Sequence, residues 1–257
     1  MVDTNAQSAQ PDQLGQLLML ASSNLPIGSY TYSQGVESAI ESGVISDEAS
    51  TLVFMQDYLA LAVIGYELPI LGLIMLALGQ GNDVLAANLA HDYHASLESK
   101  EFVLESQQLA QAMVSWLNEV LSLGIPAEIP EDGYLPLFAH IAQHWQLPLA
   151  QSMTTYGFAQ LENMVLAAVK TVPLGQMAGQ RILWQLQSDL GAQIDAVSTN
   201  IQHTFDTLMT SPDSLKEQDC QQLCQDLYEI LNISNNLPNL AILSSMHEEQ
   251  YSRLFRS

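Results

Sequence analysis

The 257-residue chain has few cysteines, few basic residues and few glycines or prolines. Two cysteines are too few for a disulfide framework. With 14 glycines, 10 prolines and 48% hydrophobic residues, the composition excludes collagen-like and low-complexity proteins and indicates a packed globule. At roughly 150 residues per domain, the length fits one large domain or two small ones.

The shortage of basic residues limits the classes of molecule that this protein can bind. Six Lys and Arg stand against 28 Asp and Glu, which gives a formal net charge of −22. Phosphate neutralisation and attraction to anionic lipids both require the opposite sign, so we expect no nucleic-acid partner and no membrane partner. The field attracts cations, either metal ions or basic faces of other proteins, although surplus acid can also simply keep an apolar chain soluble.

Long hydrophobic runs are lacking as well. The longest uncharged apolar stretch, residues 68–80, is shorter than the roughly 20 residues of a membrane-spanning helix. The first 13 residues have neither the basic nor the apolar region of a signal peptide. These observations predict a soluble, cytoplasmic protein.

The apolar residues that are present recur at spacings of three and four, which indicates helices. The longest stripe predicts a single helix over residues 182–208. A capping box of Thr31 and Gln34 predicts a short helix that Gly43 ends. Further helices are expected at residues 46–66, 69–78, 84–94, 102–121, 137–145, 149–172 and 211–231, with a break before Pro69, a loop at 124–136 and a linker at 232–239. We therefore expect an all-α protein with a single globular helical domain of about ten helices over residues 1–238 and a C-terminal interaction tail over residues 239–257.

Motifs for chemistry are scarce. Phosphate-binding, dinucleotide-binding, nucleophile-elbow and HExxH motifs do not occur, and GQMAG at residues 175–179 lacks the lysine of a P-loop. The pairs His91/His94 and His140/His144 each share a helix face and could bind a transition metal, but two ligands make no tight site, and ordinary histidines are favoured. Cys220 and Cys224 also share a face, where packing is favoured over zinc binding.

Three segments combine aromatic, glycine and basic residues in ways that suggest contacts. LPIGSYTYSQGVE carries Tyr30 and Tyr32 on a tight turn, which fits an aromatic corner and a contact surface about equally. In KTVPLGQMAGQR, Gly175 and Gly179 would let another backbone approach closely, within the chain or across a dimer. YSRLFRS has the residue mix of interface anchors and is too short to bury itself, so it should dock on its own domain or on a partner.

These segments lie within LASSNLPIGSYTYSQGVESAIESGVI, LENMVLAAVKTVPLGQMAGQR and HEEQYSRLFRS, which resemble the urease accessory protein F family. The resemblance continues in register across nearly the whole chain, including ESKEFVLESQQLAQAM. The chain departs from the family pattern at Val103 and Met246, where basic residues are usual. The acidic helix near Cys220 looks particular to this chain.

The resemblance implies an all-α adaptor without an enzymatic reaction of its own. Such proteins dimerise, join the accessory protein D or H and the GTPase accessory protein G, and act with them on apo-urease as nickel is delivered. By position, Glu37 and Lys170 become candidates for the surface that regulates the GTPase or urease, and the C-terminal tail for the surface that orders on the D/H partner. The candidate partner-binding residues are Tyr30, Tyr32, Gln34, Glu37, Lys170, Pro173, Gly175, Gln176, Gly179, Arg181, Tyr251, Arg253, Leu254, Phe255 and Arg256.

Two other hypotheses remain open from the residues. One is a metallochaperone that carries nickel itself through the paired histidines; otherwise no metal ligands and no tightly bound cofactor are predicted. The other is an enzyme using Glu and His, for which no nucleophile, base and orienting group can be named together. No catalytic residue is therefore assigned, and the dimer face is left undetermined between the PLGQMAG helix and others.

Overall fold

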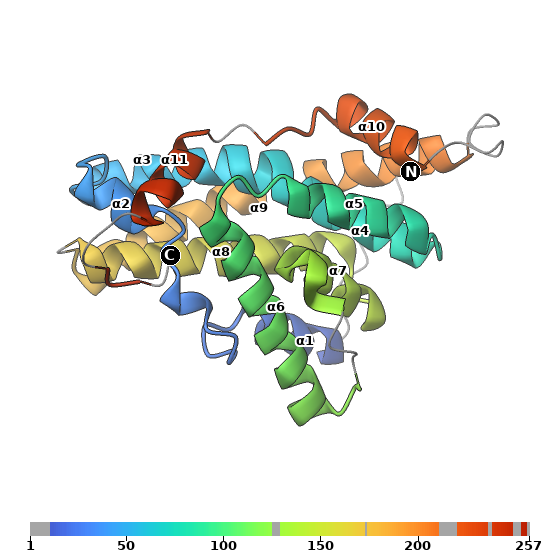
Figure 1. Cartoon of the computed structure of the whole chain (residues 1–257), viewed down its shortest axis with the longest axis horizontal. Helices are drawn as coiled ribbons and strands as arrows, with labels where there is room; N and C mark the ends of the chain where they lie inside the picture. The colour runs from blue at the N-terminus through green and yellow to red at the C-terminus, as the bar shows by residue number, and fades with distance from the viewer. Residues whose placement is uncertain are drawn as a thin grey trace.

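A computed structural model describes residues 11–124, 129–172, 174–210, 220–235, 238–248 and 253–255. Every regular element within these ranges is helical, which confirms the all-α prediction (Figure 1). The α-helices are α1 (Pro11–Ala21), α2 (Val36–Glu41), α3 (Glu48–Tyr58), α4 (Leu68–Gly79), α5 (Asp83–Ala95), α6 (Lys100–Leu121), α7 (Tyr134–His144), α8 (Leu149–Thr171), α9 (Gln176–Thr210), α10 (Cys220–Leu231) and α11 (Pro238–Glu248). Short 3₁₀ turns at Ser29–Thr31 and Ile129–Asp132 and a π-helical segment at Leu59–Glu67 complete the elements.

Helices α8 and α9 form a hairpin along the long axis of the molecule (Figure 1). The apolar stripe predicted over residues 182–208 faces inward along α9, with Ile182, Leu186 and Leu190 among its buried members. Helix α4 lies at the centre, against α5, α7, α8 and α9. Since it is packed from several sides, α4 is apolar around nearly its whole circumference rather than along one stripe.

The predicted break before Pro69 is wrong. Residues Glu48–Gly79 form one continuous helix of 32 residues. Its middle, Leu59–Glu67, is π-helical and lies directly before Pro69. In a regular α-helix the proline ring would clash with the carbonyl four residues earlier, and a widened turn at that point accommodates it. By length and composition this helix could cross a membrane, but 61% of its apolar window is buried inside the protein, as in a core helix.

Other boundaries also differ from prediction. Gly35, with a φ of 81°, is the N-cap of α2, and the capping box predicted from Thr31 and Gln34 does not form. Gly43 adopts the left-handed conformation predicted for it. The helix predicted over residues 102–121 does end at Leu121, with Ser122 as its C-cap, whereas α7 begins at Tyr134, inside the predicted loop.

At the two ends of the chain the structure adds helices. Helix α1, which the sequence analysis did not identify, packs on α8. Helix α11 occupies much of the segment predicted as a tail and packs on α2 and α6. The helix start predicted at residues 211 and 212 lies outside the described residues.

Candidate protein interaction site

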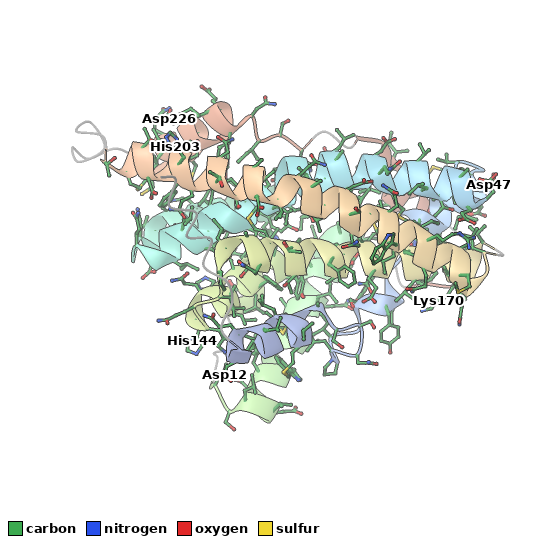
Figure 2. All side chains as sticks on the ribbon, turned by 180° about the vertical axis from the view of Figure 1, so that it is seen from behind. Asp12, Asp47, His144, Lys170, His203 and Asp226 are labelled. Atoms are coloured by element: carbon green, nitrogen blue, oxygen red, sulfur yellow. The ribbon has the colours of Figure 1, made fainter. Side chains whose placement is uncertain are left out.

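Residues from all three segments that the sequence singled out meet at one end of the molecule. Helix α11 lies over α2, and the residues 253–255 that follow it contact the same region (Figure 1). Figure 2 places Lys170 at the same end as Asp47 and far from His203 and Asp226. Of the two docking modes left open for the tail, the structure shows docking on its own domain.

The centre of this region is a buried histidine between two carboxylates. His247 is 0% exposed, and Glu37 and Glu101 are 6% and 7% exposed. The Nε2 atom of His247 lies 3.0 Å from Oε2 of Glu37, and its Nδ1 atom lies 3.1 Å from Oε1 of Glu101. Because a carboxylate only accepts hydrogen bonds, both ring nitrogens donate when His247 is an imidazolium ion.

The end of the chain completes this cluster. The backbone N–H groups of Leu254 and Phe255 donate to the Glu37 carboxylate, at 2.7 and 3.1 Å. Arg253 Nη1 donates to Glu101 Oε1 at 3.3 Å. The two carboxylates thus face the His247 ring, the Arg253 guanidinium and two backbone N–H groups, and buried carboxylates require such partners, since an unpaired buried ion is strongly destabilising. We call Glu37, Glu101, His247 and residues 253–255 the tail clasp.

Beside the tail clasp, a surface cleft holds the exposed ammonium group of Lys170. The cleft is lined by Tyr30, Thr31, Lys170, Leu254 and Phe255, and we call it the Lys170 cleft. Lys170 Nζ lies 5.4 Å from the ring centroid of Tyr30 and 5.6 Å from that of Phe255, within reach of cation–π attraction. It also donates to the backbone oxygen of Tyr30 at 3.4 Å. Phe255 is buried, whereas Tyr30 is 50% and Leu254 63% exposed, so the cleft offers an apolar surface around one cation.

Two of the predicted contact residues point inward instead. Tyr32 is buried and donates its hydroxyl hydrogen to Gln108 Oε1 at 2.6 Å. Gln34, with a positive φ of 51°, donates to Glu105 Oε1 at 2.9 Å. Both side chains therefore join the turn before α2 to α6, and Glu37 lies beneath the docked tail. As folded here, these three residues support the surface rather than form it.

The predicted contact residues in and after GQMAG lie partly inside the protein and partly on its surface. Gly179 packs against α8, where a side chain would collide with Val169, so the close approach predicted for it occurs within the chain. Gly175 has open space around it, and Gln176 is exposed. Arg181 makes a bidentate ion pair with Glu48 on the surface, at 2.8 and 2.6 Å, and lowers the pKa of that carboxyl.

Three predicted residues, Pro173, Tyr251 and Arg256, lie outside the described residues. Glu101, by contrast, belongs to the tail clasp although the sequence analysis did not select it. As an acid in the first turn of α6 it looks like ordinary helix-dipole compensation. The useful signal is its combination with a histidine and an arginine far along the chain, which only proximity in space connects.

The histidine and cysteine pairs gain no further ligands. Across the described ranges no group of three or more His, Cys, Asp and Glu side chains is placed to hold a metal ion. Burial lowers the pKa of His140, which disfavours its charged form. Cys224 lies in the hydrophobic core, and burial raises the pKa of its thiol to about 12, which confirms packing as its role.

Comparison with known proteins identifies the family. The UreF family model matches residues 45–187, more than half of the chain. A urease accessory protein UreF from Azoarcus sp. is 36% identical over 249 residues, covering 94% of each chain. The chain belongs to the UreF family.

Two further relatives support this assignment. The urease accessory protein UreF of Dechloromonas aromatica is 36% identical over 251 residues, covering 95% of this chain and 98% of that one. The bifunctional urease accessory protein UreEF of Bordetella bronchiseptica is 34% identical over 257 residues, and the match covers 97% of this chain but 53% of that protein. This chain thus corresponds to about half of that bifunctional protein.

Proposed function

We propose that this chain is a non-catalytic adaptor that presents the Lys170 cleft and the adjoining tail to other proteins of urease maturation. Membership of the UreF family supports the accessory role. We choose this surface because Tyr30, Lys170 and Leu254 meet at one partly exposed apolar cleft, although they are distant from one another in the sequence. Aromatic and cationic residues of this kind are enriched at protein interfaces.

The proposed partners are the accessory proteins D or H, the GTPase accessory protein G and apo-urease, met in the cytoplasm. The tail contacts the D/H partner, and Lys170 contacts the GTPase or urease. Nickel is the cargo of the assembled complex and moves as GTP is hydrolysed, while this chain binds no cofactor tightly. The relative named as a bifunctional UreEF protein supports such contacts, because there a UreF-like part shares one chain with a further part.

A homodimer is proposed through the first half of α9. Trp184 and Met177 on this helix are 74% and 71% exposed, values that are high for large apolar side chains. Exposed apolar side chains near one another on a surface are typical of contacts between proteins. Arg181 lies between these two positions on the same helix and forms its surface ion pair with Glu48 of α3.

Substitution at the Lys170 cleft tests the adaptor role. In cells expressing urease and its accessory proteins, Lys170→Ala or Leu254→Ser should reduce both the recovery of partner proteins with this chain and the yield of active urease. Lys170→Ala should change the free energy of unfolding by only about 0.3–1 kcal/mol, because a cation at a helix end contributes that much.

The matched control is Lys100→Ala, which removes the exposed lysine at the start of α6, a residue that does not line the cleft. Normal partner recovery and urease yield in the Lys170→Ala and Leu254→Ser variants would contradict the proposed surface. A large loss of thermal stability in Lys170→Ala would show that this lysine serves the fold instead.

A further inference from the structure

Beneath α11 lies a cavity of about 90 Å³, lined by both polar and apolar side chains, that the adaptor role does not use. Five tyrosines line it, together with carboxyl and amide side chains from several elements. We call this cavity the chamber, and its polar lining residues include Gln34, Tyr58, Tyr66, Glu67, Tyr93, Glu105, Tyr134, Tyr156 and Gln160. Its size and polarity suit several water molecules.

One acid in the chamber has an incomplete set of hydrogen bonds. Among the described residues, Glu67 Oε2 is buried without a hydrogen-bond partner, while the Tyr156 hydroxyl hydrogen-bonds the carboxyl group. Burial, together with a smaller effect of the nearby Glu105, raises the pKa of Glu67 to about 8, although the hydrogen bond from Tyr156 acts in the opposite direction. Near neutral pH this carboxyl group is therefore mainly uncharged, which reduces the cost of keeping it away from bulk water.

The C-terminal part of the chain supplies one wall of the chamber. Asn235, Leu240 and Ala241 line it from this side, and Asn235 Nδ2 donates to the backbone oxygen of Ser96 at 3.0 Å. Helix α11 also sits directly on Gly35, where an added Cβ atom would lie 3.2 Å from Leu240 Cδ1 and 3.4 Å from Leu243 Cβ. The wall is thus a helix that is distant in sequence from the rest of the lining.

Few apolar contacts hold α11 in place. Leu243 is buried, but Ile242 and Met246 are 57% and 50% exposed. The other buried side chains of this helix are polar: Ser244, whose Oγ lies 2.7 Å from Ser99 Oγ, and His247 of the tail clasp. An element with little apolar burial opens at lower free energy than the core.

We propose that α11 is a lid over the chamber, held shut by the tail clasp, and that loss of the clasp opens the chamber to solvent. Removing Leu254 and Phe255 from Glu37 would take away two of its hydrogen-bond donors and leave a buried carboxylate with too few partners, which favours exposure of the tail clasp to water. A partner that takes up the tail would therefore also open the chamber; this last step, unlike the lid itself, rests on the proposed function.

The test uses the isolated full-length protein and two variants that act on α11 by different routes. His247→Ala breaks the tail clasp, and Gly35→Ala crowds the underside of α11. Their matched controls are Met246→Ala, an exposed neighbour on the same helix, and Gly81→Ala, where the backbone has a similar positive φ of 70° and open space around it. Hydrogen exchange of residues 238–248 reports release of α11, and hydroxyl-radical oxidation of Tyr93 and Tyr156 reports opening of the chamber.

We expect faster exchange in residues 238–248 and a several-fold rise in oxidation of Tyr93 and Tyr156 in both variants, with neither change in the controls. Oxidation of Phe205, buried in the core outside the chamber, should stay unchanged. Unchanged exchange in α11, or released α11 without greater tyrosine oxidation, would overturn the proposal. So would a rise at Phe205 in both variants, since α11 would then unfold together with the core. No partner protein is involved, so the result is independent of the adaptor role.

Discussion

At the scale of single residues, the polar groups of this protein are placed according to what they can pair with. His247 is tolerated at 0% exposure because each ring nitrogen faces a carboxylate. Lys170 remains exposed and lies over two aromatic rings. Glu67 differs from both, because it has no cationic partner in the part of the chain described here and instead holds its proton.

Glu67 should make stability depend on pH in a characteristic direction. Its pKa is about 8 in the folded protein against an ordinary value of 4.5, so the native state binds more protons between these values. Its contribution to stability therefore falls as pH rises through this window, by at most about 1.4 kcal/mol per pH unit. Glu67→Gln should remove this fall, so that the variant gains stability relative to the wild type at pH 7.5 compared with pH 5.5.

Urea unfolding at a series of pH values measures the effect of Glu67. The control is Glu119→Gln, an exposed acid on α6, which should leave the slope of stability against pH as in the wild type. Tyr58, Tyr93 and Tyr156 surround Glu67 and keep their protons across this range, since burial raises the pKa of each hydroxyl. Parallel curves for wild type and Glu67→Gln would show that Glu67 titrates as an ordinary surface acid.

At the scale of elements, close approach of α8 and α9 fixes the hairpin on which the Lys170 cleft rests. Lys170 is in the last turn of α8, and Gly179 is in the first turns of α9. Without a side chain at Gly179, the Val169 side chain fills the space between the helices. This packing sets where Lys170 lies relative to Tyr30.

A methyl group at Gly179 should therefore destabilise the hairpin. We expect Gly179→Ala to lower the free energy of unfolding by about 1–3 kcal/mol, as overpacking of a filled interior does. Gly175→Ala, four residues earlier and in open space, should change it by less than about 0.5 kcal/mol. Equilibrium urea denaturation of the two variants compares them, and equal effects would mean that crowding at Val169 is not the cause.

At the scale of the whole molecule, the dominant property is the net charge of −22. Three of the six basic residues, Lys170, Arg181 and Arg253, lie in contacts described above. The remaining acids repel one another across the surface, which destabilises the compact state and favours partners with basic faces. Dissolved salt screens this repulsion and shortens the distance over which it acts.

Salt should accordingly raise the thermal stability of the isolated protein. Increasing ionic strength from about 0.01 M to about 0.1 M reduces the screening length from about 30 Å to about 10 Å. We expect the melting temperature, followed by circular dichroism, to rise by a few degrees over this range. Sodium chloride and potassium chloride should act equally, because screening depends on ionic strength. An unchanged or lower melting temperature would contradict net repulsion as a significant cost to this fold.

Sequence alone determined the helical class and the long inward stripe of α9, and it selected the segments that we propose for interaction with other proteins. These features follow from the local periodicity and the types of residue, which can be read from the sequence without knowledge of the fold. It also drew attention to Lys170 and the tail, since basic residues are scarce in so acidic a chain.

Only the tertiary structure decided which of those residues meet. The pairing of His247 with Glu37 and Glu101 spans 210 and 146 positions, and no local pattern specifies such contacts. The same holds for the continuous helix through Pro69, where a π-helical turn and burial among other helices outweigh the local tendency to break. Residue type limits what each group can do, but three-dimensional packing determines its partner, its exposure and therefore its role.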